Sequence, residues 1–186
     1  DVYKRQILFC IFAPNFSTMK TTFLGIFLFL GLLTACNDGN YSIERITFRG
    51  TEAYSCTGDT TTTFLYKTQE KQALILQFRA GLLSNRADSI TGQIGSGYTL
   101  LYRTFDAPPT SSYFCTSPPA TSPRVTSEIQ AQGGTVSIVT REIVDTVAGT
   151  VKYKHLVRIR DLNITNENGE RLIEKDFNFG SYQTAR

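Results

Sequence analysis

The sequence contains no tryptophan and only one histidine, His155. A single histidine excludes a histidine cluster for a metal ion. Any nucleophile activated by an imidazole base would depend on this one side chain. The motifs G-x-S-x-G and H-E-x-x-H are absent, as is the C-x-x-C spacing of structural zinc sites. We therefore expect no metal site, no cofactor and no catalytic residues, in a protein that is not an enzyme.

Two weaker signals for chemistry lie in the acidic residues. Asp59, Glu142 and Asp161 are available as a carboxylate pair of the kind that cleaves glycosidic bonds, but their spacing selects no pair. Four oxygen-bearing side chains gather near one predicted turn without EF-hand spacing: Asp161, Asn163, Glu167 and Glu170. Turn chemistry accounts for that group. A hydrolase of the glycoside type stays as the alternative to a non-catalytic protein.

Blocks of like charge are also lacking. The formal net charge of +3 falls to about +1 once the first 35 residues are set aside, because they hold Lys4, Arg5 and Lys20 against Asp1. The remaining Lys and Arg residues are scattered along the chain. This pattern argues against nucleic acid as a partner.

The longest hydrophobic run is Phe23–Leu33. A helix of about eleven residues reaches roughly 16 Å, well short of a hydrocarbon core of roughly 30 Å. The run follows Lys20 and ends in Leu33-Thr34-Ala35-Cys36, the pattern of a bacterial lipobox, in which the thiol after the cleavage site receives lipid. We expect Cys36 to be the lipidated first residue of the mature protein. The alternatives are an ordinary signal peptide with a chance cysteine and a buried core helix.

These signals divide the chain into four parts. Met19-Lys20 is a natural start and the first six residues resemble a translated sequencing adapter, so we expect residues 1–18 to be upstream sequence rather than protein. Residues 19–35 are the signal peptide, expected as a helix, and residues 36–42 are a short tether. Such a tether reaches only about 15 to 20 Å, which keeps the domain close to its membrane. Residues 43–186 form a single domain, long enough to bury a core.

Two cysteines remain in this domain, Cys56 and Cys115. They form an even pair in a compartment where disulfides persist. A disulfide closing a loop of about sixty residues stabilises a domain by roughly 4 kcal/mol on the chain-entropy model. Two buried free thiols are the alternative.

Alternating apolar and polar residues predict strands through most of the domain. The predicted ranges are 43–49, 60–67, 72–78, 98–105, 125–132, 135–143, 151–164 and 171–179. His155 lies on the apolar phase of its strand, which favours a satisfied core histidine, and a phase change near Arg160-Asp161 predicts a bulge. Since no 3.6-residue period is sustained, we expect an all-β domain, an antiparallel β-sandwich or barrel of about eight to ten strands.

Glycine and proline mark the connections. Gly92, Gly95 and Gly97 do not fit a phosphate-binding loop and predict a bend or bulge. Gly133-Gly134 between two strand runs predicts a hairpin. Residues 81–90 leave open a crossover, a further strand or a helix. The proline-rich residues 107–123 predict a loop that a Cys56–Cys115 disulfide would hold down.

Three parts of the domain carry a resemblance to known proteins. They are Tyr54-Ser55-Cys56 with Phe64-Leu65-Tyr66-Lys67, Tyr102-Arg103-Thr104-Phe105 with Tyr113-Phe114-Cys115-Thr116-Ser117-Pro118-Pro119, and Tyr153-Lys154-His155 with 177–184. Over nearly all of the domain the sequence resembles small uncharacterised lipoproteins of flavobacteria, in the Bacteroidota. The resemblance implies secretion, lipid anchoring and the cysteine pair, and it implies no known activity.

These features predict a lipid-anchored protein of the cell envelope, in the outer membrane. They leave open whether it lies on the periplasmic or the surface face. Its β domain is expected to bind or to support structure rather than to catalyse. The expected partners are the membrane, through the lipid, and an envelope protein or glycan. Four tyrosines are available for ligand contacts, although packing in the core is the favoured use: Tyr98, Tyr102, Tyr113 and Tyr182.

Replacing Cys36 with Ser removes the thiol that receives lipid and should release the protein from membranes, because stable anchoring needs the acyl chains. Fractionation of cells that express the wild type and Cys36→Ser measures this. Ser42→Ala is the control, since it changes a residue of the tether and leaves the Cys36 thiol in place. A Cys36→Ser protein that stays with the membrane fraction would show that Cys36 is not the anchor.

Overall fold

Seven of the eight strands in the described residues form where alternating side chains predict them, with shifted ends, and the eighth, at residues 88–94, was not predicted. The computed structural model describes residues 48–118, 120–147, 149–166, 169 and 171–185. The described chain forms eight strands and one five-residue helix: β1 Phe64–Gln69, β2 Gln72–Phe78, β3 Asp88–Ile94, β4 Gly97–Phe105, α2 Ser111–Cys115, β5 Val125–Gln130, β6 Gly133–Asp145, β7 Thr150–Thr165 and β8 Arg171–Ala185. The predicted all-β fold is confirmed. The helix left open for residues 81–90 does not form there; that segment leads irregularly into β3.

Several predictions fall on residues outside this description. They are the signal peptide at 19–35, lipidation of Cys36, the tether at 36–42 and most of the strand at 43–49. The described part belongs to one unit that spans Tyr41–Arg186.

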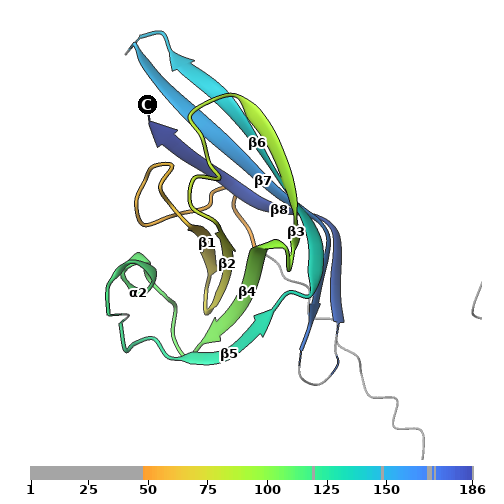
Figure 1. Cartoon of the computed structure of the whole chain (residues 1–186). Helices are drawn as coiled ribbons and strands as arrows, with labels where there is room; N and C mark the ends of the chain where they lie inside the picture. The colour runs from red at the N-terminus through yellow and green to blue at the C-terminus, as the bar shows by residue number, and fades with distance from the viewer. Residues whose placement is uncertain (1–47, 119, 148, 167–168, 170, 186) are drawn as a thin grey trace, which may run out of the picture. The chain divides into compact units, whose positions relative to one another are not determined.

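The strands form one mixed sheet in the order β1-β2-β4-β3-β6-β7-β8, with β5 beside β4. Its longer ladders are antiparallel, as predicted, and β3 and β4 share only a two-residue parallel contact. The sheet curls so that β1 and β2 face β7 and β8, as Figure 1 shows. Of the two predicted architectures, the structure is a nearly closed barrel.

The sheet bends where the β3–β6 pair meets the β4–β5 pair. β3 pairs with β6, and β4 pairs with β5, so residues 88–105 run alongside residues 125–145 with a break in register between them. On one side of the break lie Gly95 and Gly97, at φ +90° and +91°. The predicted bend at these glycines is confirmed.

The predicted hairpin at Gly133-Gly134 is wrong. The backbone changes partners here instead of reversing, because Ala131 N donates to Leu100 O and Gln132 N donates to Asn163 O. A Cβ on Gly134 would lie 3.2 Å from side-chain carbons of both Ile94 and Ile159. The glycine therefore permits close packing at a corner, which local sequence does not distinguish from a turn.

Two further bulges bend the long strands on the other side. Asp161 has φ +49°, and between Arg160 and Asn163 β7 carries one residue more than β6, which confirms the predicted bulge. β8 has its own register shift opposite Val157 and Arg158. These shifts change which face each residue occupies. Ile173 shares the sequence alternation of the buried Phe177 and Phe179, yet it is 52% exposed.

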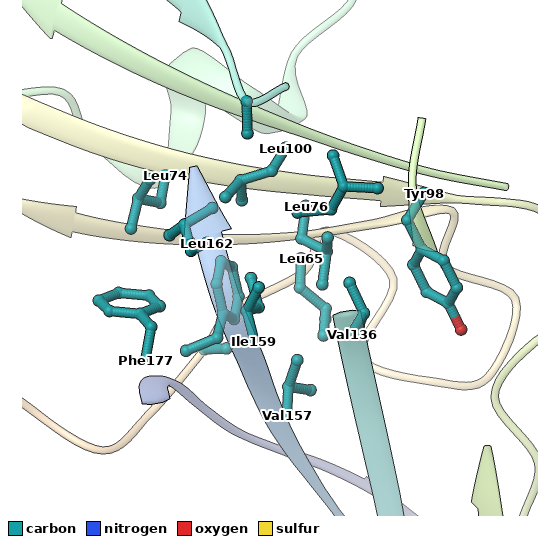
Figure 2. Close-up of a cluster of buried hydrophobic side chains, with 14 of the residues drawn as sticks. Leu65, Leu74, Leu76, Tyr98, Leu100, Val136, Val157, Ile159, Leu162 and Phe177 are labelled. Carbon is teal, nitrogen blue, oxygen red and sulfur yellow. The ribbon is translucent and has the colours of Figure 1, made fainter. Parts of the chain in front are cut away.

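The barrel interior is filled by aliphatic and aromatic side chains from both halves of the sheet. In Figure 2, Leu74, Leu76 and Leu100 face Ile159 and Leu162 across the interior. Leu65, Leu74, Leu76, Leu100, Val136, Ile138, Val157, Ile159, Leu162 and Phe179 are fully buried. Burial of such side chains provides about 1.5–3 kcal/mol each before entropy costs.

A second, smaller cluster lies on the outer face of β1, β2 and β4. It consists of Tyr66, Ile75 and Leu101, with Phe64 and Phe114 packed against it. Phe114 comes from α2, and its ring stacks on Tyr66 at a centroid distance of 4.2 Å. The segment that contains α2 thus covers apolar side chains that would otherwise face water.

The disulfide Cys56–Cys115 holds this segment down. The two Cα atoms are 5.3 Å apart across 59 residues of sequence. Cys115 is the last residue of α2, and Cys56 follows the segment that packs beside β1. The predicted pairing and its role for the proline-rich loop are confirmed.

Residues 51–54, here called the closing segment, bridge the two ends of the sheet. Glu52 pairs in parallel with Ser181 of β8, and Tyr54 pairs antiparallel with Tyr66 of β1. Four backbone hydrogen bonds of 2.7–2.9 Å make these two bridges. The closing segment therefore satisfies backbone groups on both edge strands.

Gly180 and Lys67 fit the closing segment to the barrel. Gly180 has φ +136°, and a Cβ there would lie 3.0 Å from Glu52 C and 3.1 Å from Ala53 N. The Lys67 side chain is 2% exposed, and its Nζ donates to Gly50 O at 2.7 Å and to Phe179 O at 3.1 Å. Burial lowers the pKa of Lys67 from its ordinary value.

Gly180→Ala should destabilise the domain by about 1–3 kcal/mol, because the new Cβ adds a backbone clash to an unfavourable φ. Urea unfolding measures the loss. Gly95→Ala is the matched control, since Gly95 has φ +90° but no atom within 4 Å of the added Cβ. Equal losses in the two variants would mean that close approach of the closing segment contributes nothing.

Candidate functional site

A pocket opens beside the closing segment, where that segment and β8 diverge. Its volume is about 320 Å³. We call it the seam pocket and define it by its lining residues: Glu52, Ala53, Tyr54, Ser55, Ser181, Tyr182 and Gln183. All of them come from two stretches of chain more than a hundred residues apart in sequence.

Hydroxyl groups tie the two walls of the seam pocket together. Ser55 Oγ donates to Tyr182 Oη at 3.0 Å, and Tyr182 Oη donates to Asp59 O at 2.8 Å. Ser181 Oγ donates to Thr51 O at 3.1 Å. These hydroxyls are already engaged, so they fix the shape of the pocket rather than wait for a ligand.

The side chains free to meet a ligand are Glu52, Tyr54 and Gln183. All three are exposed, and the Tyr54 ring is 49% exposed. Tyr54 Oη donates to Glu52 Oε2 at 3.3 Å, and no ion pair to Glu52 occurs within the described ranges. The pocket therefore presents a carboxylate, a carboxamide and an aromatic surface.

Asp59, whose backbone oxygen accepts from Tyr182 Oη, is a turn residue outside the pocket lining. Its Oδ1 accepts from the Thr61 hydroxyl at 2.6 Å and from Thr61 N at 2.8 Å. The hydrogen bond from the Thr61 hydroxyl, followed by the one from the Thr61 backbone, holds the pKa of Asp59 below its usual range. The Asp59 carboxylate is therefore ionised and accepts hydrogen bonds within its turn, so it is not suited to act as a general acid.

His155, the only imidazole, is fully buried inside the barrel. Its Nδ1 lies 2.8 Å from Thr140 Oγ1 and its Nε2 lies 3.1 Å from Thr184 Oγ1. Tyr182 stacks on the ring at a centroid distance of 6.0 Å. The prediction of a satisfied core histidine is confirmed.

The hydrogen-bond chain around His155 selects one neutral tautomer. Asn85 Nδ2 donates to Ala185 O at 2.8 Å, which turns Asn85 Oδ1 towards Thr184, whose hydroxyl donates to it at 2.6 Å. Thr184 Oγ1 then accepts from His155 Nε2–H, and Nδ1 accepts from Thr140. Burial lowers the pKa of His155 to about 4. The ring is neutral at pH 7 and has no proton acceptor role left for a substrate.

Two of the carboxylates considered for glycoside hydrolysis, Glu142 of β6 and Asp161 of β7, do not form a pair. Glu142 accepts from Tyr153 Oη, and Asp161 accepts from Lys175 Nζ. Tyr153 is the partner of Glu142 in the β6–β7 ladder, so eight residues of β7, a path of about 26 Å, separate the two carboxylates. Catalytic pairs require roughly 5–9.5 Å.

The turn acids do not gather as a metal site within the described part of the chain. No group of three or more His, Cys, Asp or Glu side chains there is placed to hold an ion. Asn163 Oδ1 is buried without a hydrogen-bond partner. Glu167 and Glu170 lie outside the described residues.

The tyrosines considered for ligand contacts are mostly core residues. Tyr98, Tyr102 and Tyr182 are 5–8% exposed. Tyr113 is half-buried and packs edge-on against Phe105 and Phe114. The favoured use in packing is confirmed for these four.

Glu52, Tyr54 and Gln183 belong to no sequence motif that marks them as site residues. The only local signal was a short alternation around Ser55. The pocket exists because a segment outside the named strands runs beside β8, and that contact has no signature in either stretch alone.

Comparisons with protein-family models, with curated proteins and with solved structures found no match. Among the helices in the described residues, none has the length and apolar character needed to cross a membrane.

The free energy of unfolding should fall as the pH drops from about 6.5 to about 4. In this range His155 is protonated in the unfolded chain and stays neutral in the folded chain. The loss attributable to His155 is about 3 kcal/mol, present in full below pH 4 and absent above pH 6.5. Urea unfolding of the wild type and His155→Gln at steps across this range measures it. The variant should be less stable at pH 7 but show a shallower pH slope; parallel slopes would contradict the assignment.

Proposed function

We propose that this protein is a lipid-anchored component of the bacterial cell envelope whose barrel domain binds an envelope component in the seam pocket without transforming it. The lipobox ending at Cys36 supports the anchor. The Cys56–Cys115 disulfide supports an oxidising compartment, where such bonds persist.

The observation that carries the binding role is the construction of the seam pocket. Its walls are fixed by backbone bridges and by the Ser55–Tyr182–Asp59 chain of hydrogen bonds. Cys56, which follows the lining residue Ser55, is fixed by the disulfide to Cys115. Rigid walls with a few unpaired polar side chains are typical of pre-formed ligand sites.

A binding role without catalysis is supported by the state of the groups that would do chemistry. His155 is buried and hydrogen-bonded through both ring nitrogens. Glu142 and Asp161 each accept a hydrogen bond from a neighbour and lie far apart along the β6–β7 ladder. Glu52, the carboxylate of the pocket, then serves as a hydrogen-bond acceptor.

Binding should require an open seam pocket. The lipidated protein in detergent is mixed separately with peptidoglycan sacculi, with outer-membrane glycolipid and with detergent-extracted envelope protein, and retention is measured in each. Gln183→Trp places a large ring in the pocket and should reduce retention at least tenfold in the arm that binds.

Gln77→Trp is the matched control, because Gln77 is also an exposed strand residue but lies on β2, outside the pocket. Retention of Gln183→Trp at the level of Gln77→Trp would show that binding occurs elsewhere. Since the natural chain has no tryptophan, the same variant also reports occupancy by fluorescence.

A further inference from the structure

The ladder between the closing segment and β8 stops inside the seam pocket. Ser181 N donates to Thr51 O, and Ala53 N donates to Ser181 O. A continuing parallel ladder would join Gln183 N to Ala53 O and Ser55 N to Gln183 O. Neither bond is present among the described residues, and none of those residues forms another hydrogen bond to the Gln183 backbone on this side.

The ladder stops because the chain turns towards β1. Tyr54 N donates to Tyr66 O and Tyr66 N donates to Tyr54 O, each at 2.8 Å. These bonds draw residues 54 and 55 away from β8. Within the part of the chain that the structure describes, each wall of the pocket is left with a backbone donor and a backbone acceptor that have no partner.

The unpaired edge of β8 is short. It begins after Ser181, and it ends at Ala185, whose carbonyl oxygen is capped by Asn85 Nδ2 at 2.8 Å. Between them only Gln183 has its N–H and C=O directed at the gap, because backbone groups of alternate residues point the same way. A peptide that adds to a sheet edge needs several such residues in succession. A single residue with a free N–H and C=O is enough to bind a ligand that carries one amide group.

A lone secondary amide matches both walls at once. Its N–H and C=O point in opposite directions. Its oxygen would accept from Gln183 N–H on β8, and its N–H would donate to Ala53 O on the closing segment. It would thereby span the first of the two missing bonds, the one from Gln183 N to Ala53 O.

The polar side chains around this amide position can form hydrogen bonds with hydroxyl groups of a ligand. The Glu52 carboxylate accepts hydrogen bonds, and the Gln183 carboxamide both donates and accepts them. The exposed Tyr54 ring offers an apolar surface with a polar tip, suited to the C–H face of a ring. The volume of about 320 Å³ is at the lower end for ligand pockets, roughly 300–1,000 Å³.

We propose that the seam pocket binds N-acetylated amino sugars, and that their acetamido group bridges Gln183 N–H and Ala53 O across the split ladder. This inference rests on the proposed binding function and names the ligand class of the same site. The amide supplies selectivity, and the sugar hydroxyls bind to Glu52 and to the Gln183 side chain.

Calorimetry on the lipidated protein in a zwitterionic, sugar-free detergent tests this with three probes. Methyl N-acetyl-β-glucosaminide carries both the amide and the hydroxyls, methyl β-glucoside lacks the amide, and N-acetylalanine methylamide lacks the hydroxyls. The first should bind at least tenfold more tightly than either of the others. A glucoside that binds equally well, a peptide amide that binds better, or no binding by any probe would overturn the proposal.

Two substitutions at one position separate the backbone from the side chain. Gln183→Pro removes the N–H that faces the gap, a change that edge strands tolerate, whereas Gln183→Ala keeps it. Gln183→Pro should bind the acetamido sugar no better than the glucoside, while Gln183→Ala should keep the preference with about threefold weaker binding. Unchanged preference in Gln183→Pro, with its urea midpoint near that of Gln183→Ala, would refute the bridge.

The outcome is separable from that of the proposed function. If an envelope fraction is retained by the wild type and lost with Gln183→Trp, but none of the three probes binds, the binding role stands and the ligand class assigned here is wrong.

Discussion

The structure depends on closure of the sheet by a segment only four residues long. Residues 51–54 hydrogen-bond to β8 on one side and to β1 on the other, so that the two edge strands of the curled sheet are joined. Exposed strand edges invite pairing with other chains, and a closed sheet removes most of that hazard. The closing segment has few side-chain contacts of its own in the core, apart from Ala53. Its hold comes from backbone bonds at a position where Gly180 lets two backbones approach.

Two buried polar side chains support this closure from inside. Lys67 Nζ donates to Gly50 O, next to the closing segment, and to Phe179 O of β8. His155 links β6, β7 and β8 through two threonines. A buried polar group stabilises a fold only when its hydrogen bonds are made, and breaking one such network costs more than an apolar replacement of the whole. Both groups therefore favour one arrangement of strands over its alternatives.

The same closure creates the candidate site. A segment that hydrogen-bonds to β8 and then to β1 cannot continue its ladder with β8. Where it leaves β8, backbone donors and acceptors are exposed between the walls of the pocket. The α2 segment and its disulfide secure the neighbouring end of this region through Cys56. A site built this way uses main-chain groups held by tertiary structure, with Glu52, Tyr54 and Gln183 as the variable lining.

The sequence by itself predicted seven of the eight strands, the apolar face in the middle of β7 that carries His155, the bulge at Asp161 and, with two free thiols as the alternative, the pairing of Cys56 with Cys115. These features depend on side-chain alternation, backbone preference or cysteine number, which are local or countable. Only the tertiary structure decided that Gly133-Gly134 is a corner rather than a turn, that Ile173 faces water, and that residues 52–55 and 181–183 share a pocket. The physical reason is that these outcomes depend on which strands become neighbours. Gly134, Gly180 and Gln183 acquire their roles from backbone that approaches them from distant parts of the chain, and no pattern within a few residues of each encodes that approach.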